Sequence, residues 1–168
     1  MDRFIGELRH VEQNVDFFII DTAAGINQDV LAFLLSSNEI FVVTTGEPTA
    51  ITDAYAIIKA IVHKKRNATI RLIVNMCRTD DEAERIFNKI NAVSVRFLNK
   101  KLKLLGGILY DSTVSRAVRK QKPFLHHYPN SPASLGVRAI AKKMLEARTV
   151  QNTGNLQDFF TNIKGFIS

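Results

Sequence analysis

Short apolar runs alternate with longer segments of helical periodicity along most of this chain, and this alternation restricts the fold more than any other feature of the sequence. The apolar runs cover residues 15–21, 39–45, 70–76 and 102–109. Apolar residues recur at helical spacing in residues 28–35, 54–62, 83–90 and 132–145. Nearly continuous apolar strands that alternate with helices are typical of parallel sheets covered on both faces. We therefore predict an α/β fold in which a parallel sheet of four strands is flanked by helices.

Length and composition are those of a single globular domain. A chain of 168 residues with 46% hydrophobic content can bury one sizeable core. We assign residues 1–148 to this domain, the polar residues 149–155 to a linker, and residues 156–168 to a tail. The single cysteine, Cys77, excludes an internal disulfide and is interpreted as a small buried hydrophobe. No signal peptide and no apolar run of the roughly 20 residues that span a bilayer is found, so we expect a cytoplasmic protein.

Positive charge is unevenly distributed along the chain. The net charge is +7, but the stretch from Lys59 to Arg148 contains 20 Lys and Arg residues against 6 Asp and Glu residues. A basic face of this kind could meet nucleic acid, anionic lipid or an acidic protein, or it could be an ordinary solvated helix surface. Composition alone does not decide between these partners.

The strongest local signal for chemistry is the sequence from Asp21 to Gly25, which directly follows an apolar run. A carboxylate at this position can hold a magnesium-bound water, and a nearby glycine lets a backbone N–H approach a terminal phosphate. The alternative is an Asp that ends a strand before a flexible loop. The four histidines and Cys77 show no spacing of metal ligands, so we predict no metal site besides that of a nucleotide's magnesium.

Several longer stretches resemble a known family. These are residues 16–27, the run Val42-Val43-Thr44-Thr45-Gly46-Glu47-Pro48-Thr49-Ala50-Ile51-Thr52-Asp53-Ala54-Tyr55, and residues 73–76, 107–111 and 122–124. Together they resemble the MinD and ParA superfamily of P-loop ATPases, and within it the FlhG group, also called FleN, which regulates flagellar number and position. The resemblance extends from about Val15 to Leu145.

The resemblance assigns roles to individual residues. It implies that Asp21 is the switch carboxylate near magnesium, that Gly25 senses the terminal phosphate, and that Asn75 recognises adenine, whose edge needs both a donor and an acceptor. Asp111 would lie on the loop near the base. The alternatives are that Asn75 bonds its own backbone and that Asp111 is the N-cap of a helix.

The resemblance also implies cofactors, partners and a function. ATP and Mg²⁺ would drive formation of a homodimer that associates with the inner face of the membrane and positions flagella or division machinery. An FlhF-like GTPase is the implied partner. The alternatives are a ParA-like DNA-partition ATPase with nonspecific DNA binding and a non-catalytic interaction module.

Family members place a phosphate-binding loop of the type K-G-G-x-G-K-T near their N-terminus, and these 168 residues contain no such sequence. The adjacent pair Gly106-Gly107 lies inside a strand pattern with no Lys-Thr or Lys-Ser after it, so it cannot replace that loop. Without the loop's backbone N–H groups and lysine, most of the triphosphate charge has no partner. We therefore expect an ATPase only in the complete protein and weak ATP binding by this chain alone.

The tail has the pattern of an amphipathic helix. Apolar residues at helical spacing form one stripe, which consists of Leu156, Phe159, Phe160, Ile163, Phe166 and Ile167. Members of the MinD and FlhG group resemble this chain in having a C-terminal membrane-targeting helix, so we expect the stripe to bind anionic membrane. The alternative is a helix docked on its own domain or on a dimer partner, because the polar side of the tail has no excess of basic residues.

Overall fold

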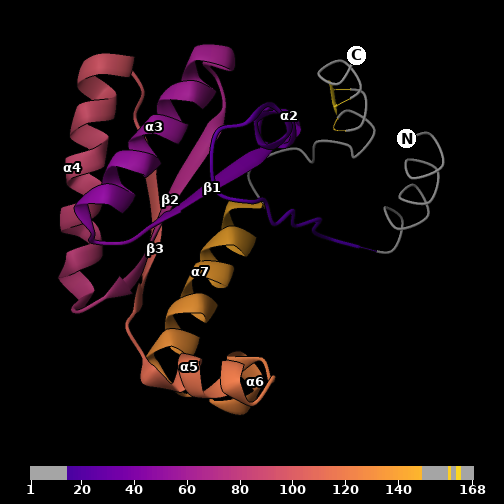
Figure 1. Ribbon diagram of the computed structural model, residues 1–168, viewed down its shortest axis with the longest axis vertical. Helices are drawn as coiled ribbons and strands as arrows, with labels where there is room; N and C mark the ends of the chain where they lie inside the picture. Colours follow the sequence, from indigo (N-terminus) through magenta and orange to yellow (C-terminus); the bar gives the residue numbers. More distant parts are fainter. Residues whose placement is uncertain (1–14, 149–158, 160–161, 164–168) are drawn as a thin grey trace.

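A three-stranded parallel sheet, in the order β1-β2-β3, forms the centre of the molecule (Figure 1). The computed structural model describes residues 15–148 together with 159, 162 and 163. The strands are β1 (Glu39–Thr44), β2 (Thr69–Cys77) and β3 (Lys103–Leu109). Ile40 of β1 is opposite Ile70 of β2, and each strand is joined to the next by a helix on the same side of the sheet. The predicted α/β class and parallel pairing are confirmed.

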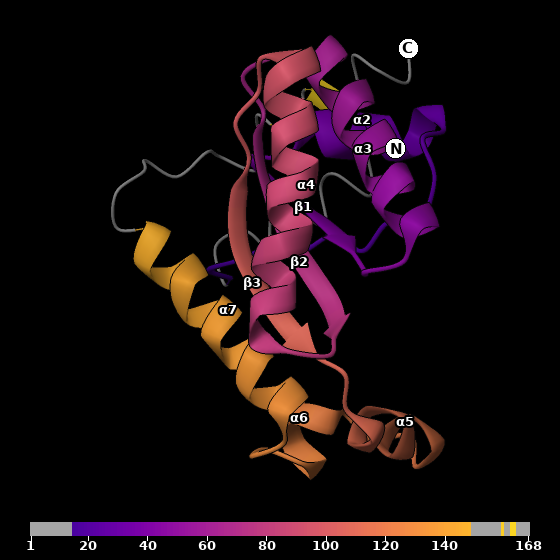
Figure 2. The ribbon, with the colours of Figure 1, turned by 90° about the vertical axis from the view of Figure 1, so that its left-hand side faces the viewer.

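Helices cover the two faces of the sheet unequally (Figures 1 and 2). On one face lie α3 (Pro48–Lys64) and α4 (Asp80–Leu98), side by side, and α2 (Gln28–Ser36) packs next to α3. On the other face α7 (Pro132–Arg148) lies against β3. The buried core lies between the sheet and the α3–α4 layer and includes Ile58, Ile61, Leu72, Val74 and Ile90.

The apolar run at residues 15–21 is not a strand, which corrects the prediction of four strands. The segment is irregular, and the side chain of Ile19 is 76% exposed. A strand forms only where a neighbouring strand supplies hydrogen-bond partners, and β1 pairs with β2 alone within the part of the chain that the structure describes. The apolar pattern is compatible with a strand. Residues 15–21 are irregular because none of the described strands pairs with them.

Glycines allow β3 to be packed closely from both sides. A Cβ on Gly107 would lie 2.7 Å from the Cβ of Ala83 in α4, and one on Gly106 would lie 2.8 Å from Cγ1 of Ile140 in α7. On the facing helix, a Cβ on Gly136 would approach the Gly107 carbonyl oxygen to 3.1 Å. The pair Gly106-Gly107 therefore serves helix–sheet packing inside a strand, as the sequence pattern indicated, and not phosphate binding.

Two short helices extend beyond the sheet, at the bottom of Figure 2. They are α5 (Ser112–Arg119) and α6 (Phe124–His127), and both lie between the end of β3 and the start of α7. Neither helix was predicted from the apolar pattern, because each is short and buries few side chains. Among the described helices, none combines the length and the hydropathy that a bilayer-spanning segment requires.

Candidate functional site

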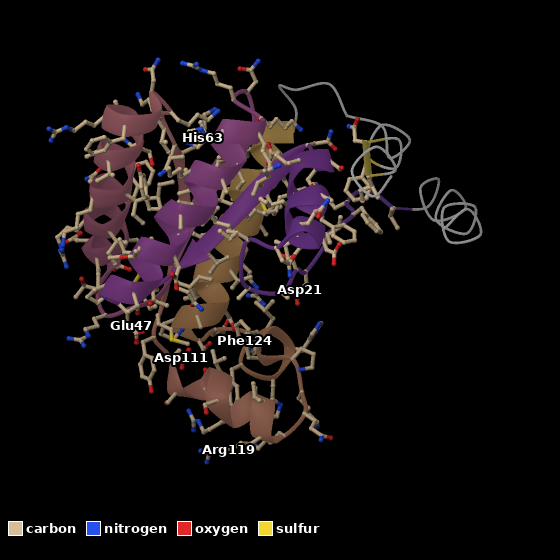
Figure 3. All side chains as sticks on the ribbon, turned by 45° about the horizontal axis from the view of Figure 1, so that its top comes forward. Asp21, Glu47, His63, Asp111, Arg119 and Phe124 are labelled. Atoms are coloured by element: carbon tan, nitrogen blue, oxygen red, sulfur yellow. The ribbon has the colours of Figure 1, made fainter. Side chains whose placement is uncertain are left out.

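The carboxyl ends of the three strands are the place to look for a ligand, because open parallel sheets bind ligands beyond this edge. Asn75 lies among the last three residues of β2 and Asp111 follows β3, so the topology brings these two predicted residues to the same edge of the sheet. Figure 3 shows Asp111 and Glu47 toward this end of the sheet, with His63 at the opposite end of α3. Asp21 is placed apart from both carboxylates in the same view.

A bulge sets the position of Asn75. The register between β2 and β3 is irregular between Val74 and Cys77, and Met76 has a φ of 57°, in the left-handed region that a side chain rarely adopts. The Asn75 Oδ1 accepts a hydrogen bond from the Met76 N–H (2.9 Å). Pairing resumes where the Tyr110 N–H donates to the Cys77 carbonyl (2.8 Å). Such strained bulges are common beside binding sites.

Asn75 thus has the backbone contact that the sequence offered as its alternative role. Its Oδ1 is engaged, whereas its Nδ2 donates to no residue within the described part of the chain. The Asn75 Nδ2 is free to donate a hydrogen bond to a base at this edge. The Asn75 Oδ1 could accept one only by sharing or replacing its hydrogen bond with the Met76 N–H. The role of Asn75 toward adenine therefore stays a prediction.

Asp111 ties the beginnings of two helices together. One carboxylate oxygen accepts from the Thr113 N–H (2.8 Å) and caps α5, and the other accepts from the Ala133 N–H in the first turn of α7 (3.3 Å). The side chain of Thr113 is the main cause that lowers the pKa of Asp111 to about 2, and the N–H groups of Thr113 and Ala133 also lower it. The N-cap interpretation is confirmed. The contact with Ala133, far along the chain, is one that sequence reasoning missed.

We expect Asp111→Ala to destabilise the fold by about 1 kcal/mol at neutral pH, because a lost N-cap typically costs that much. The folded pKa of about 2 lies below the ordinary value of 3.8, so the stabilisation is present above that value and is lost as the pH falls toward 2. Urea unfolding at several pH values should show the gap between wild type and variant closing in acid. Asp111→Asn is the matched control, because it keeps an acceptor without a charge. A gap independent of pH in both variants would contradict this account.

Asp21 and Gly25 lie in the segment that leads into α2. Asp21 is exposed, and Gly25 has a φ of 114°, a conformation that favours glycine. The described residues contain no group of three potential metal-ligating side chains. Magnesium is usually held by one or two carboxylates, with water and substrate phosphates completing its shell, so one exposed carboxylate fits a water-mediated role. Asp21 would hold the ion in this way, and the phosphates would need donors from elsewhere.

The tail is docked on its own domain at the residues that the structure describes. Phe159 and Ile163 are each 6% exposed and pack against Ile20 and Phe33. The Phe159 ring also meets the Phe18 ring edge-on, with centroids 6.4 Å apart. The other residues of the predicted stripe, Leu156, Phe160, Phe166 and Ile167, and the predicted linker lie outside the described residues.

Sequence reasoning did not identify the surface that receives the tail. The sequence of α2 did contain a signal for such a surface. Its large apolar residues are too many for one face of a short helix, so some of them must be covered by something other than the domain core. Of these, Phe33 faces the tail. Ile20 and Phe18 were assigned to a buried strand, and they contact the tail instead.

Cys77 has the structural role that the sequence predicted. It is buried. Burial and the nearby Glu82 charge raise the pKa of its thiol, so the thiolate needed for nucleophilic chemistry is disfavoured.

A hollow lined by Ile26, Leu31, Leu35 and Lys64 lies between α2 and the last turn of α3.

Comparison with known proteins identifies the family of this chain. A ParA family model, described as NUBPL iron-transfer P-loop NTPase, matches residues 1–145. The chain belongs to the ParA family of P-loop NTPases. Over 134 residues, the chain is 38% identical to the antiactivator FleN of Pseudomonas aeruginosa. These residues cover 80% of the chain and 48% of FleN.

Two further relatives are named as site-determining proteins. The flagellum site-determining protein YlxH of Helicobacter pylori is 34% identical over 142 residues, which cover 84% of the chain and 47% of YlxH. The septum site-determining protein MinD of Bacillus subtilis is 30% identical over 138 residues, which cover 82% of the chain and 50% of MinD. The resemblance to the MinD and FlhG group is confirmed. The chain spans about half the length of these curated relatives.

Proposed function

We propose that this chain is the switch-bearing part of an ATP-dependent protein that positions flagella or division machinery, as the names of its relatives indicate. One observation supports the proposal most strongly. The tail packs on Phe18 and Ile20, and Ile20 directly precedes Asp21 in the chain. A movement of the switch segment and release of the tail would therefore be linked by a shared contact.

In this proposal, nucleotide acts through small movements at the switch. Asn75 would receive the base at the end of β2, and Asp21 would hold magnesium through a bound water, with Gly25 close to the terminal phosphate. Phosphate positioning would come from a phosphate-binding loop outside these 168 residues. When Asp21 moves toward the ion, Ile20 moves with it, and the apolar contact with Phe159 and Ile163 is disturbed.

Release of the tail would expose its apolar stripe to the inner face of the cell membrane. One short helix binds membrane marginally, and an ATP-dependent homodimer would present two, so that the second binds at a high effective concentration. The docked tail would correspond to the cytoplasmic state. A localisation partner such as an FlhF-like GTPase would then be recruited at the membrane.

The receiving surface offers a test that leaves the tail unchanged. We expect Phe33→Ala to increase co-sedimentation with anionic liposomes by roughly tenfold, because removing about 1.5 kcal/mol of aromatic contact shifts the docking equilibrium by that factor. The same variant without residues 156–168 should not sediment. Ala32→Gly in the same helix, whose side chain is buried but is not part of the tail contact, serves as a stability control.

The proposal fails if Phe33→Ala leaves liposome binding unchanged while the tail is shown to be released, for example by increased protease cleavage after residue 148. It also fails if sedimentation persists without the tail. In either case the docked tail is a structural element of the domain and not a membrane anchor.

A further inference from the structure

The outer side of α4 has exposed aromatic and aliphatic side chains where a solvated helix surface would be polar. Phe97 is 65% exposed and Val93, one turn earlier, is 38% exposed. Figure 2 shows α4 facing the viewer along its whole length, with no described element in front of it. Single exposed apolar residues are common, but an aromatic ring and a neighbouring Val one helical turn apart form a small continuous patch.

Cations lie beside this patch and along the helix before it. The guanidinium carbon of Arg96 lies 5.2 Å from the centroid of the Phe97 ring, which holds the ring at the surface. Arg85, Lys89 and Arg96 share the exposed side of the helix, and none of them forms an ion pair with a carboxylate of the described residues. Between Arg85 and Tyr110 the sequence contains 6 Lys and Arg residues and no Asp or Glu.

The helix dipole explains only part of this arrangement. A cation in the last turn, such as Arg96, is stabilised by the dipole, and the acidic residues of the first turn are stabilised in the same way. Arg85 and Lys89 lie in the middle of the helix, where the dipole has little effect. The dipole also gives no reason for an exposed Phe97. The combination therefore points to a ligand with both negative charge and an apolar group.

We propose that this surface, formed by Arg85, Lys89, Val93, Arg96 and Phe97, binds an acidic segment of a partner protein. An apolar side chain of that segment would pack beside Phe97 and Val93, and its carboxylates would meet the three cations. Charge complementarity favours an anionic partner. A peptide is favoured over duplex DNA because DNA presents phosphates to a convex helix and has no apolar side chain to cover Val93 and Phe97.

The surface lies away from the nucleotide edge. α4 begins near the carboxyl ends of the strands and runs antiparallel to them (Figure 1). Its last turn, which contains Phe97, therefore lies at the opposite end of the sheet from Asn75 and Asp111. It is also on a different helix from Phe33, which receives the tail. The partner would therefore bind without competing for either contact, and this inference does not rest on the proposed function.

A display library of random short peptides, selected on the full chain and counter-selected on the Phe97→Ala/Arg96→Ala variant, tests the proposal. We expect enriched sequences that combine Asp or Glu with Leu, Ile or Phe. For a synthesised winner, each single substitution should weaken binding by about tenfold, with stronger weakening at high salt. Val118→Ala and Arg119→Ala on α5 are matched controls, because Val118 is 68% exposed beside an exposed arginine, and they should leave affinity within about twofold.

Three results would overturn the proposal. One is the absence of enrichment over the counter-selected variant. Another is equal loss of affinity in the α5 controls, which would indicate binding by overall charge. The third is Phe97-dependent binding of duplex DNA or of phosphatidylglycerol vesicles that is tighter than binding of the selected peptide. Because Phe97 and Arg96 are exposed, their substitution should leave the domain folded. Circular dichroism of each variant checks that a loss of binding is not caused by unfolding.

Discussion

Asp21→Ala, introduced into a complete protein that also carries the phosphate-binding loop, should lower ATP hydrolysis by about 100-fold and abolish ATP-dependent dimerisation. The expected size follows from losing a group that positions a metal ion through its bound water. Asp21 is exposed and caps none of the described helices, so its loss should leave the fold intact. Turnover at saturating ATP, measured over a range of magnesium concentrations, checks the expectation.

Asp29→Ala is the matched control, because Asp29 is an exposed carboxylate in the first turn of α2, close in sequence to the switch segment. Its loss should change the stability of the helix slightly and leave turnover unchanged. If Asp21→Ala and Asp29→Ala hydrolyse ATP at the wild-type rate, the switch carboxylate has been assigned to the wrong residue. If both lose activity, the segment acts through its overall charge.

Gly107→Val should destabilise the domain by about 3 kcal/mol, at the upper end of the usual range for overpacking a core. A Cβ at this position would lie 2.7 Å from the Cβ of Ala83, and Gly136 of α7 closes the other side of the strand. α4 cannot move away without opening the core between the sheet and the α3–α4 layer. Urea unfolding measured by circular dichroism gives the change in the free energy of unfolding.

A pair of substitutions separates this clash from a general effect of valine. Gly107→Ala combined with Ala83→Gly should be less destabilising than the sum of the two single changes, because Ala83→Gly removes the atom that the new Cβ would meet. Ala92→Val, on the exposed side of α4, should change stability by no more than about 0.5 kcal/mol. Additive effects of the pair would show that the contact at Gly107 does not limit packing.

The helices and strands of the core could be predicted from periodicity because each contains enough apolar residues to define a face. The strand at residues 70–76 and the helix at residues 83–90 are examples, and both correspond to longer elements of the structure, β2 and α4. α5 and α6 could not be predicted in this way. They are short, and they are held by the Asp111 cap and by contacts with one another more than by an apolar stripe.

The candidate site was predicted less completely than the fold. Asn75 near the end of β2 and Asp111 after β3 lie at the edge of the sheet that was predicted, because the order of elements fixes where the loops lie. The bulge at Met76 and the contact between Asp111 and Ala133 depend on how β3 and α7 pack, and no local pattern records that packing. Their roles toward nucleotide remain predictions.

The α/β class, the parallel sheet and the family could be predicted without a structure, because hydrophobic periodicity and the resemblance of the motifs are properties of local segments. The tertiary structure alone decided the fate of two apolar segments. The run at residues 15–21 is not a strand because β1 pairs with β2 alone among the described strands, and the tail is docked because Phe18, Ile20 and Phe33 form a surface for Phe159 and Ile163. An apolar segment is stable only where other residues shield it from water. Which surface covers it depends on residues far away in the chain, and these are brought together only by folding.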